Sequence, residues 1–366
     1  MKINQKQKIL FLDNLASLLN SGIPVIQAFD IISFQTKNKK ILSIIETIRN
    51  AISKGETFFS ISMKLSGVFN VFDIAMIETG EATGQIGKAF EVIVSKEEKE
   101  FDLKRKVKQA LMYPIIILLI TFAMLTVIMT FVIPKIEGIY KESNVNLPPL
   151  TTAVIGISHF FVNNLLLIII GIFLVIIVCG ILYKKVPLIR LNYDKNILKL
   201  PIFGEIIKKK TLINFSDFLS TLLGSGIMIN KALQIIKNAM DNSFYSLVVE
   251  NISNEVKVGK PLSYAMGVNI LDKKIEVAQQ EKMDLETKTF AFPIELSTAV
   301  RIGEQTGTLS KMLHKTSARY TKEIDNTIKN LTTILEPIII VVIGVIVGTI
   351  IMAIMLPFLN IANVVK

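Results

Sequence analysis

One 13-residue stretch of this chain occurs twice. Residues 11–23 read FLDNLASLLNSGI and residues 215–227 read FSDFLSTLLGSGI, with eight identical residues at a constant separation of 204 positions. Both copies carry leucines at helical spacing and end in Ser-Gly-Ile, where glycine suits the left-handed residue that closes a helix. We therefore predict that each copy is the first helix of a repeated unit, closed by Gly22 in the first and by Gly226 in the second.

The repeat continues into a Gly-Glu motif. TGEATG at 79–84 corresponds to IGEQTG at 302–307, now at a separation of 223 positions. The 19 additional residues of the second copy fall at about 268–290, a charged segment that we interpret as a surface insertion. The two motifs provide six further candidates for helix breaks or partner contacts, which are Gly80, Glu81, Gly84, Gly303, Glu304 and Gly307.

Two roles are open for these motifs. The glycines favour helix breaks, and we expect Gly80 and Gly303 to be left-handed there. The glutamates are expected near a helix N-terminus, where the helix dipole stabilises a carboxylate. The alternative role is direct contact with a partner protein, and the residues alone do not decide between the two.

Three uncharged runs predict transmembrane helices. They are Ile115–Ile133, Leu165–Tyr183 and Ile338–Leu356, each of 19 residues. At about 1.5 Å per residue, each covers nearly all of a hydrocarbon core of about 30 Å. The first and third follow Pro114 and Pro337 at corresponding positions of the repeat, so each repeat is a polar domain followed by one span. The middle span has no counterpart and returns the chain to the side on which it started.

Lysine and arginine predict the orientation. They cluster before the first span and after the second, whereas the stretch between these spans holds only Lys135 and Lys141. The positive-inside rule then places the N-terminus in the cytoplasm and the C-terminus outside. The predicted order is a first cytoplasmic domain at 1–112, a span at 113–134, an external loop at 135–163, a span at 164–183, a second cytoplasmic domain at 184–336, a span at 337–357 and an external tail at 358–366. Few stretches alternate like strands, so we predict an all-α membrane protein with two homologous helical bundles.

The sequence offers little for chemistry. The only cysteine is Cys179, and the two histidines, His159 and His314, have no nearby ligand partners, so we predict no metal, cofactor or catalytic site. TGEATGQIGKAF at 79–90 fails as a phosphate-binding loop because Ala82 and Ala89 replace the required Gly and Ser/Thr. The charge of +11 fits a membrane protein better than a nucleic-acid-binding protein. Four acidic residues lie among lysines, and we interpret them as a solvated helix face: Glu97, Glu98, Glu100 and Asp102.

These residues together resemble the type II secretion F family. The resemblance covers nearly the whole chain and includes ALMYP before the first span, FVIPKIEGIY at its end, NLPPLTT in the external loop, KLPIFGEIIKK before the second domain and LEPIII before the third span. It implies a multi-pass platform of the bacterial inner membrane, used in type II secretion, type IV pili or competence pseudopili. It also implies that the protein is not an enzyme, forms homo-oligomers, and contacts a cytoplasmic hexameric ATPase, pilin or pseudopilin helices and other inner-membrane assembly proteins.

Two other classes are kept as alternatives. Parallel repeats also occur in transporters, so an oligomeric transporter or channel is the second hypothesis, although the spans contain no charged residue. An enzyme or signalling protein is the third, and it would need a nucleotide site that we do not find in the sequence. The residues do not tell whether the machinery secretes protein, takes up DNA, adheres or moves.

Overall fold

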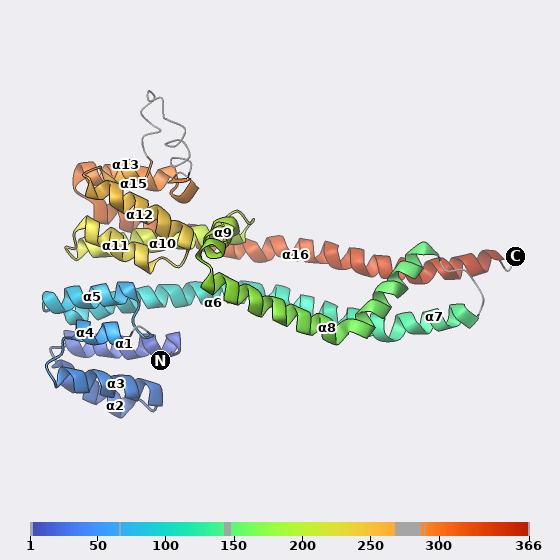
Figure 1. The fold of residues 1–366 in the computed structure, drawn as a ribbon, viewed down its shortest axis with the longest axis horizontal. Helices are drawn as coiled ribbons and strands as arrows, with labels where there is room; N and C mark the ends of the chain where they lie inside the picture. The colour runs from blue at the N-terminus through green and yellow to red at the C-terminus, as the bar shows by residue number, and fades with distance from the viewer. Residues whose placement is uncertain (1–2, 66, 143–147, 268–286, 289, 365–366) are drawn as a thin grey trace, which may run out of the picture. The chain divides into compact units, whose positions relative to one another are not determined.

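The computed structural model describes residues 3–65, 67–142, 148–267, 287–288 and 290–364 (Figure 1). Within these ranges every regular element is helical, as the sequence predicts. Most of the insertion predicted at 268–290 lies outside the described residues. The chain divides into two compact units, one comprising Met1–Arg105 and Leu191–Asp325 and the other Lys106–Arg190 and Asn326–Lys366.

The first unit contains both repeats, and their helices correspond one to one. The first repeat consists of α1 (Gln5–Asn20), α2 (Val25–Gln35), α3 (Lys39–Ile52), α4 (Phe58–Lys64), α5 (Val71–Ala82) and the start of α6 (Ile86–Val127). After α9 (Pro187–Ile197), the second repeat consists of α10 (Phe203–Gly224), α11 (Ile229–Ala239), α12 (Ser243–Lys257), α13 (Leu262–Ala265), α15 (Ile294–Thr306) and the start of α16 (Leu309–Val364). The duplicated stretch therefore lies in α1 and in the second half of α10.

Aromatic side chains centre the core of each repeat. In the first repeat, Phe58 stacks on Phe29 with ring centroids 6.1 Å apart and meets Phe90 edge-on at 5.4 Å. In the second, Phe292 contacts Phe215 at 4.7 Å and Tyr245 at 5.9 Å. All six side chains are almost fully buried. Removing a side chain of this size from water contributes about 1.5–3 kcal/mol, so these rings hold the short helices together.

The two repeats pack against each other within the first unit. Phe72 of α5 stacks on Phe218 of α10 with ring centroids 4.3 Å apart. Charged residues flank this ring pair, and one continuous cluster of buried apolar residues extends through both repeats. The helical bundles predicted from the sequence are thus joined by a buried contact.

The second unit holds the apolar helices. It contains the later part of α6, the π-helix η1 (Ile128–Val132), α7 (Ile133–Glu142), α8 (Pro149–Lys185) and the later part of α16. In the described part of the chain, three helices are long and apolar enough to cross a membrane, in agreement with the predicted number. Thr151 of α8 donates a hydrogen bond to the Ala353 carbonyl of α16 (2.7 Å), and Ser158 donates one to the Met129 carbonyl of η1 (2.6 Å). Most other side chains of these helices are exposed, as expected for surfaces that face lipid.

Two segments are more helical than the sequence pattern indicates. The predicted limit between domain and span at residue 113 lies within α6, which continues through Pro114 without a break. Between Lys88 and Tyr113 the chain has no glycine, and lysine, glutamate, alanine and leucine favour one long helix there. The range 135–163, predicted as a loop, contains most of α7 and the first turns of α8, which starts at Pro149. Proline is well suited to the first position of a helix, which explains this start.

Candidate functional site

The duplicated stretch closes its helix in the same way in both repeats. Gly22 has φ 81° and Gly226 has φ 80°, both in the left-handed region. The Ile23 amide donates to the Leu18 carbonyl at 3.1 Å, and the Ile227 amide donates to the Leu222 carbonyl at 3.0 Å. This is the Schellman pattern, which satisfies the last carbonyls of a helix and requires a residue that tolerates positive φ. The conserved spacing within the chain thus fixes an identical turn in each repeat.

In the Gly-Glu motifs, the second glycine of each pair holds the left-handed turn. Gly84 and Gly307 both have φ 68° and follow the ends of α5 and α15. Gly80 and Gly303, which we expected to be left-handed, lie inside these helices without positive φ. Each instead provides the carbonyl that accepts the closing hydrogen bond, from the Gln85 amide at 2.7 Å in the first repeat.

Close packing explains why Gly80 and Gly303 are glycines. A Cβ at Gly80 would lie 2.5 Å from the Cβ of Ala89, and one at Gly303 would lie 2.7 Å from the Cα of Leu309. Both distances are well below van der Waals contact, so any larger residue would push the following helix away. The first glycine of each motif therefore allows the start of the following helix, α6 or α16, to pack closely against the end of the preceding helix, α5 or α15.

The glutamates bind a helix N-terminus, but it is the N-terminus of a different helix. The Glu81 carboxylate accepts hydrogen bonds from the backbone amides of Phe58 (2.7 Å) and Phe59 (2.9 Å) at the start of α4. Glu304 does the same for Leu262 (2.6 Å) and Ser263 (3.0 Å) at the start of α13. Each carboxylate thus satisfies two amides that have no partner within their own helix, and it lies at the positive end of the helix dipole.

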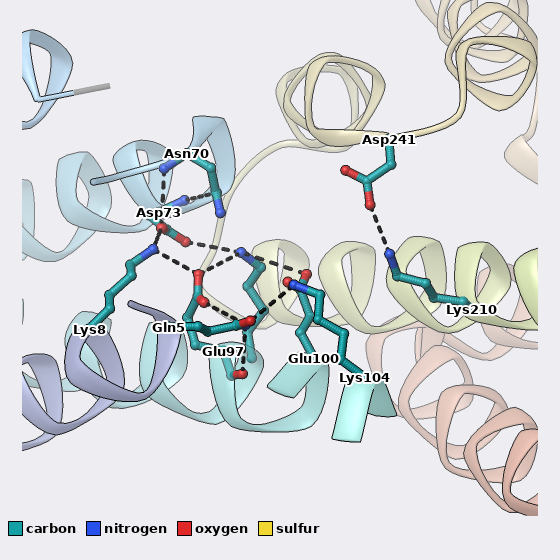
Figure 2. Close-up of polar contacts among 10 residues, drawn as sticks. Gln5, Lys8, Asn70, Asp73, Glu97, Glu100, Lys104, Lys210 and Asp241 are labelled. Carbon is teal, nitrogen blue, oxygen red and sulfur yellow. Dashed lines mark hydrogen bonds and ion pairs between the residues drawn. The ribbon is translucent and has the colours of Figure 1, made fainter. Parts of the chain in front are cut away.

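A cluster of charged residues is buried in the first repeat (Figure 2). Lys8 of α1 lies 2.7 Å from Asp73 of α5 and 2.7 Å from Glu97 of α6. Lys96 approaches the same two carboxylates at 3.3 and 3.5 Å. The Asp73 side chain is fully buried and the others are at most 10% exposed. We call Lys8, Asp73, Lys96 and Glu97 the ionic cluster.

Hydrogen bonds and rings complete the surroundings of the ionic cluster. The backbone amide of Asn70 donates to the Asp73 carboxylate at 3.2 Å, and the side-chain amide of Gln5 donates to the Glu97 carboxylate at 3.1 Å. The Lys96 ammonium also lies 5.6 Å from the ring centroid of Phe72 and 5.8 Å from that of Phe218. Cation–π attraction of this kind links the ionic cluster directly to the contact between the repeats.

Pairing within the ionic cluster outweighs the cost of burial. Burial by itself lowers the pKa of Lys96, but the charges of Asp73, Glu100 and Glu97 raise that pKa above its ordinary value of 10.5. Burial likewise raises the pKa of Glu97, but Lys8 and Lys96 bring it below its ordinary value of 4.5. Both groups are therefore charged at neutral pH, and removing one partner would leave an uncompensated buried charge.

The second repeat has no such cluster at the corresponding positions. Leu212 and Leu296 replace Lys8 and Asp73, and Tyr320 replaces Glu97, and all three are buried. We predicted from the sequence that Glu97 belongs to a solvated helix face, and this is wrong because α1, α5 and α10 cover that side of α6. The signal was available in the repeat itself, since apolar residues at corresponding positions indicate a buried face.

The other side chains that could act in catalysis or bind a metal, which are the two histidines and the cysteine, lie apart from one another. His159 pairs with Glu137 at 2.7 Å in the second unit. His314 lines a shallow hollow at the start of α16 together with Thr308, Ser310 and Lys311. Cys179 is exposed on α8. Among the described residues, no three His, Cys, Asp or Glu side chains gather as metal ligands.

The fold and both motifs define an all-helical protein built from a repeat, in which each copy ends in a helix long and apolar enough to cross a membrane. The profile of the family described as "Type II secretion system (T2SS), protein F" matches the chain twice, at residues 11–134 and 215–357. The two matches begin at the duplicated stretch and end after the first and third predicted spans. Together they cover more than half of the chain, and the chain belongs to this family.

Individual relatives are similar over most of their length. A type IV pilus assembly protein PilC from Pseudomonas aeruginosa is 28% identical over 364 residues, covering 100% of this chain and 92% of the relative. A type IV pilus assembly protein PilC from Thermus thermophilus is 30% identical over 336 residues, covering 91% of this chain and 77% of the relative. A type II secretion system protein F from Vibrio cholerae is 24% identical, covering 96% and 82%.

Proposed function

We propose that this protein is a non-enzymatic platform of the bacterial inner membrane that couples a cytoplasmic hexameric ATPase to filament assembly. The filament is a type IV pilus or a pseudopilus of type II secretion or competence. The observation that carries this proposal is the double family match, because each match joins one helical domain to one span. Relatives named as pilus assembly and type II secretion proteins support the same role.

The architecture fits a protein that transmits force and does not generate it. The sequence contains no P-loop, so the energy for assembly comes from a partner in this proposal. The carboxylates of Glu81 and Glu304 and the ionic cluster tie short helices to long ones within the first unit. A unit held by such contacts moves as a body, which is what a coupling element between motor and filament requires.

The two units have different partners in this proposal. The repeats face the cytoplasm and contact the ATPase, and the spans contact pilin or pseudopilin helices within the bilayer. Exposed apolar side chains on α6 and α16, such as Leu119, Ile120 and Val341, provide surfaces that suit another transmembrane helix.

Deletion of the gene tests the proposed role. We expect the deletion strain to lack assembled filaments by electron microscopy while filament subunits remain in the membrane fraction by immunoblot. A plasmid copy of the wild-type gene should restore filaments. Normal filaments in the deletion strain would refute the proposal.

Site-specific photo-cross-linking tests the partner assignment. A photoreactive residue at exposed turns of the first unit, such as Lys54 or Val258, should capture the ATPase, and one at Ile120 should capture filament subunits. If no position in either repeat captures the ATPase, coupling runs through another protein and this part of the proposal fails.

A further inference from the structure

The two repeats meet through different faces, and among the described residues this leaves one face of each repeat uncovered. The first repeat contributes α5 and α6, and the second contributes α10 and α11. The contact consists of the Phe72–Phe218 ring pair, an ion pair of Lys99 with Asp217 (2.9 Å) and an ion pair of Lys231 with Glu78 (2.8 Å). Because unlike faces meet, the contact is heterologous, and the same kind of contact can be added again at either end.

The open faces follow from the correspondence of the repeats. The α15/α16 face of the second repeat corresponds to the α5/α6 face, and the α1/α2 face of the first repeat corresponds to the α10/α11 face. Three residues of the α5/α6 face have counterparts on the α15/α16 face. Phe72 corresponds to Glu295, Glu78 to Arg301 and Lys99 to Lys322. Three residues of the α10/α11 face likewise have counterparts on the α1/α2 face. Phe218 corresponds to Asn14, Asp217 to Asp13 and Lys231 to Gln27.

These two open faces are chemically complementary. If the two faces met, Lys322 and Asp13 would form the ion pair that corresponds to that of Lys99 with Asp217. In place of the Phe72–Phe218 ring pair, Glu295 would accept a hydrogen bond from the side-chain amide of Asn14. In place of the Glu78–Lys231 ion pair, Arg301 would donate to the side-chain carbonyl of Gln27. None of the three pairs brings like charges together.

The six side chains are also available. Asp13, Gln27, Glu295 and Lys322 are exposed, and Asn14 and Arg301 are half-buried. In the described part of the chain, none of the six side chains makes a hydrogen bond or an ion pair, and the Glu295 charge acts only at longer range on Arg319 and Tyr320. In contrast, the corresponding Asp217 and Phe218 are covered by the other repeat.

We propose that the α15/α16 face of one copy of this protein binds the α1/α2 face of a second copy, and that this contact repeats the one between the two repeats of a single chain. The partner is a second copy because the open faces carry a lysine and an aspartate at the positions of the Lys99–Asp217 ion pair that joins the repeats. Replacement of the ring pair by Glu295 and Asn14 suits an interface between separate chains, since both faces stay soluble when unpaired. This association is independent of the filament role proposed above.

Heterotypic cross-linking in membranes tests this contact with the full chain. In a Cys179→Ser background, an Asp13→Cys copy and a Lys322→Cys copy with different tags are co-expressed and treated with a short bismaleimide. We expect a cross-linked dimer that carries both tags. Cells that express only Asp13→Cys, or only Lys322→Cys, should give no dimer above the matched control of Lys54→Cys with Val258→Cys, which lie at corresponding exposed turns outside both faces.

The outcomes separate the possible arrangements. A heterotypic product no stronger than the control, or a homotypic product as strong as the heterotypic one, overturns the proposal, and the latter indicates a symmetric dimer. A Lys99→Cys/Asp217→Cys chain should cross-link internally and shows that the reagent spans this geometry and that the variant folds.

Charge reversal provides a second measurement. Self-association followed by energy transfer between labelled copies in vesicles should weaken about 3- to 10-fold with Asp13→Lys or with Lys322→Asp, because single exposed ion pairs contribute modestly. The double variant Asp13→Lys/Lys322→Asp should regain most of the lost association. Unchanged association in both single variants, or no recovery in the double variant, overturns the pairing of these two residues.

Discussion

At the scale of single residues, the Asp73 carboxylate determines how costly the ionic cluster is to disturb. It is fully buried and holds Lys8 and Lys96 at 2.7 and 3.3 Å. Replacing Asp73 by Leu leaves two buried ammonium groups short of a partner, and we expect a loss of about 3–5 kcal/mol of stability. Thermal unfolding of the purified protein, followed by circular dichroism, measures the effect.

The second repeat supplies the control for this variant. Adding Lys8→Leu to Asp73→Leu reproduces the Leu212 and Leu296 pair, which is apolar and buried. The double variant should be more stable than Asp73→Leu alone, since one unpaired charge is removed. A double variant that unfolds at the same or a lower temperature would contradict this account of the ionic cluster.

The ionic cluster also predicts how stability depends on pH. The lowered pKa of Glu97 gives stability that is present above pH 4.5 and is lost as pH falls through the folded-state pKa. The raised pKa of Lys96 gives stability that is present below pH 10.5 and is lost as pH rises through its folded-state pKa. We expect Glu97→Gln to reduce the unfolding temperature at pH 7 and to lose that difference in acid. A constant difference between wild type and Glu97→Gln down to pH 3 would exclude this assignment.

The sequence shows part of this residue-scale information and hides the rest. Gly22 and Gly226 are recognisable because a Ser-Gly-Ile ending after a leucine-rich helix has a local cause. Lys8 is harder to interpret, although it lies on the same helix face as Phe11, Leu12 and Leu15. Its partners are 65 and 89 positions away, and no spacing rule reaches that far. Comparison with Leu212 in the other repeat is the one internal signal that marks the position as buried.

At the scale of elements, the Gly-Glu motif joins three helices in each repeat. Glu81 ends α5, binds the first amides of α4, and is followed by the turn into α6. We expect Glu81→Ala to loosen the start of α4, with a cost of about 1–3 kcal/mol for the two amides left without a partner. Hydrogen exchange should speed up at Phe58 and Phe59 and stay unchanged at the amides of α2.

The equivalent Glu304→Ala variant separates structure from partner contact. If the motif only holds helices, it should release the amides of Leu262 and Ser263 in the same way. Loss of ATPase binding with unchanged exchange at these amides would instead support a direct contact role for the glutamates.

The glycines of the same motif should differ in their response to alanine. Gly303→Ala places a Cβ 2.7 Å from the Leu309 backbone, so the start of α16 must shift. Gly307→Ala meets nothing within 4 Å but must adopt φ 68°, a strain of about 1 kcal/mol. We expect Gly303→Ala to lower the thermal midpoint more than Gly307→Ala does. The reverse order would mean that the left-handed turn, and not the close packing, is the feature that matters.

Element boundaries were the least predictable feature for a physical reason. The predicted limit between domain and span at residue 113 lies inside one helix, α6, which runs from Ile86 to Val127, because the residues before Pro114 are strong helix formers with no glycine among them. The role of Glu81 near a helix N-terminus could be anticipated, whereas the identity of that helix depends on tertiary contacts 22 and 23 residues away.

At the scale of the whole molecule, the repeat is what makes the fold predictable. Two copies separated first by 204 and then by 223 positions define domain, motif and span in order, and the family profile matches at those same places. An odd number of spans and two parallel copies then require an unrepeated return helix, which α8 provides. The orientation in the membrane stays a prediction, because it rests on lysine and arginine alone.

Reporter fusions test that orientation. If the positive-inside rule holds, alkaline phosphatase should be active when fused after Glu142 or after Lys366, and green fluorescent protein should fluoresce when fused after Arg190 but not at the C-terminus. Lys184 and Lys185 at the end of α8 provide the basic flank that keeps the second repeat inside. Replacing both by Gln should lower fluorescence of the Arg190 fusion, whereas the same change at Lys39 and Lys40, which the fusion retains and which lie far from any predicted span, should have little effect. A fluorescent C-terminal fusion would place the third span in the opposite direction and would remove the second repeat from the side where an ATPase can reach it.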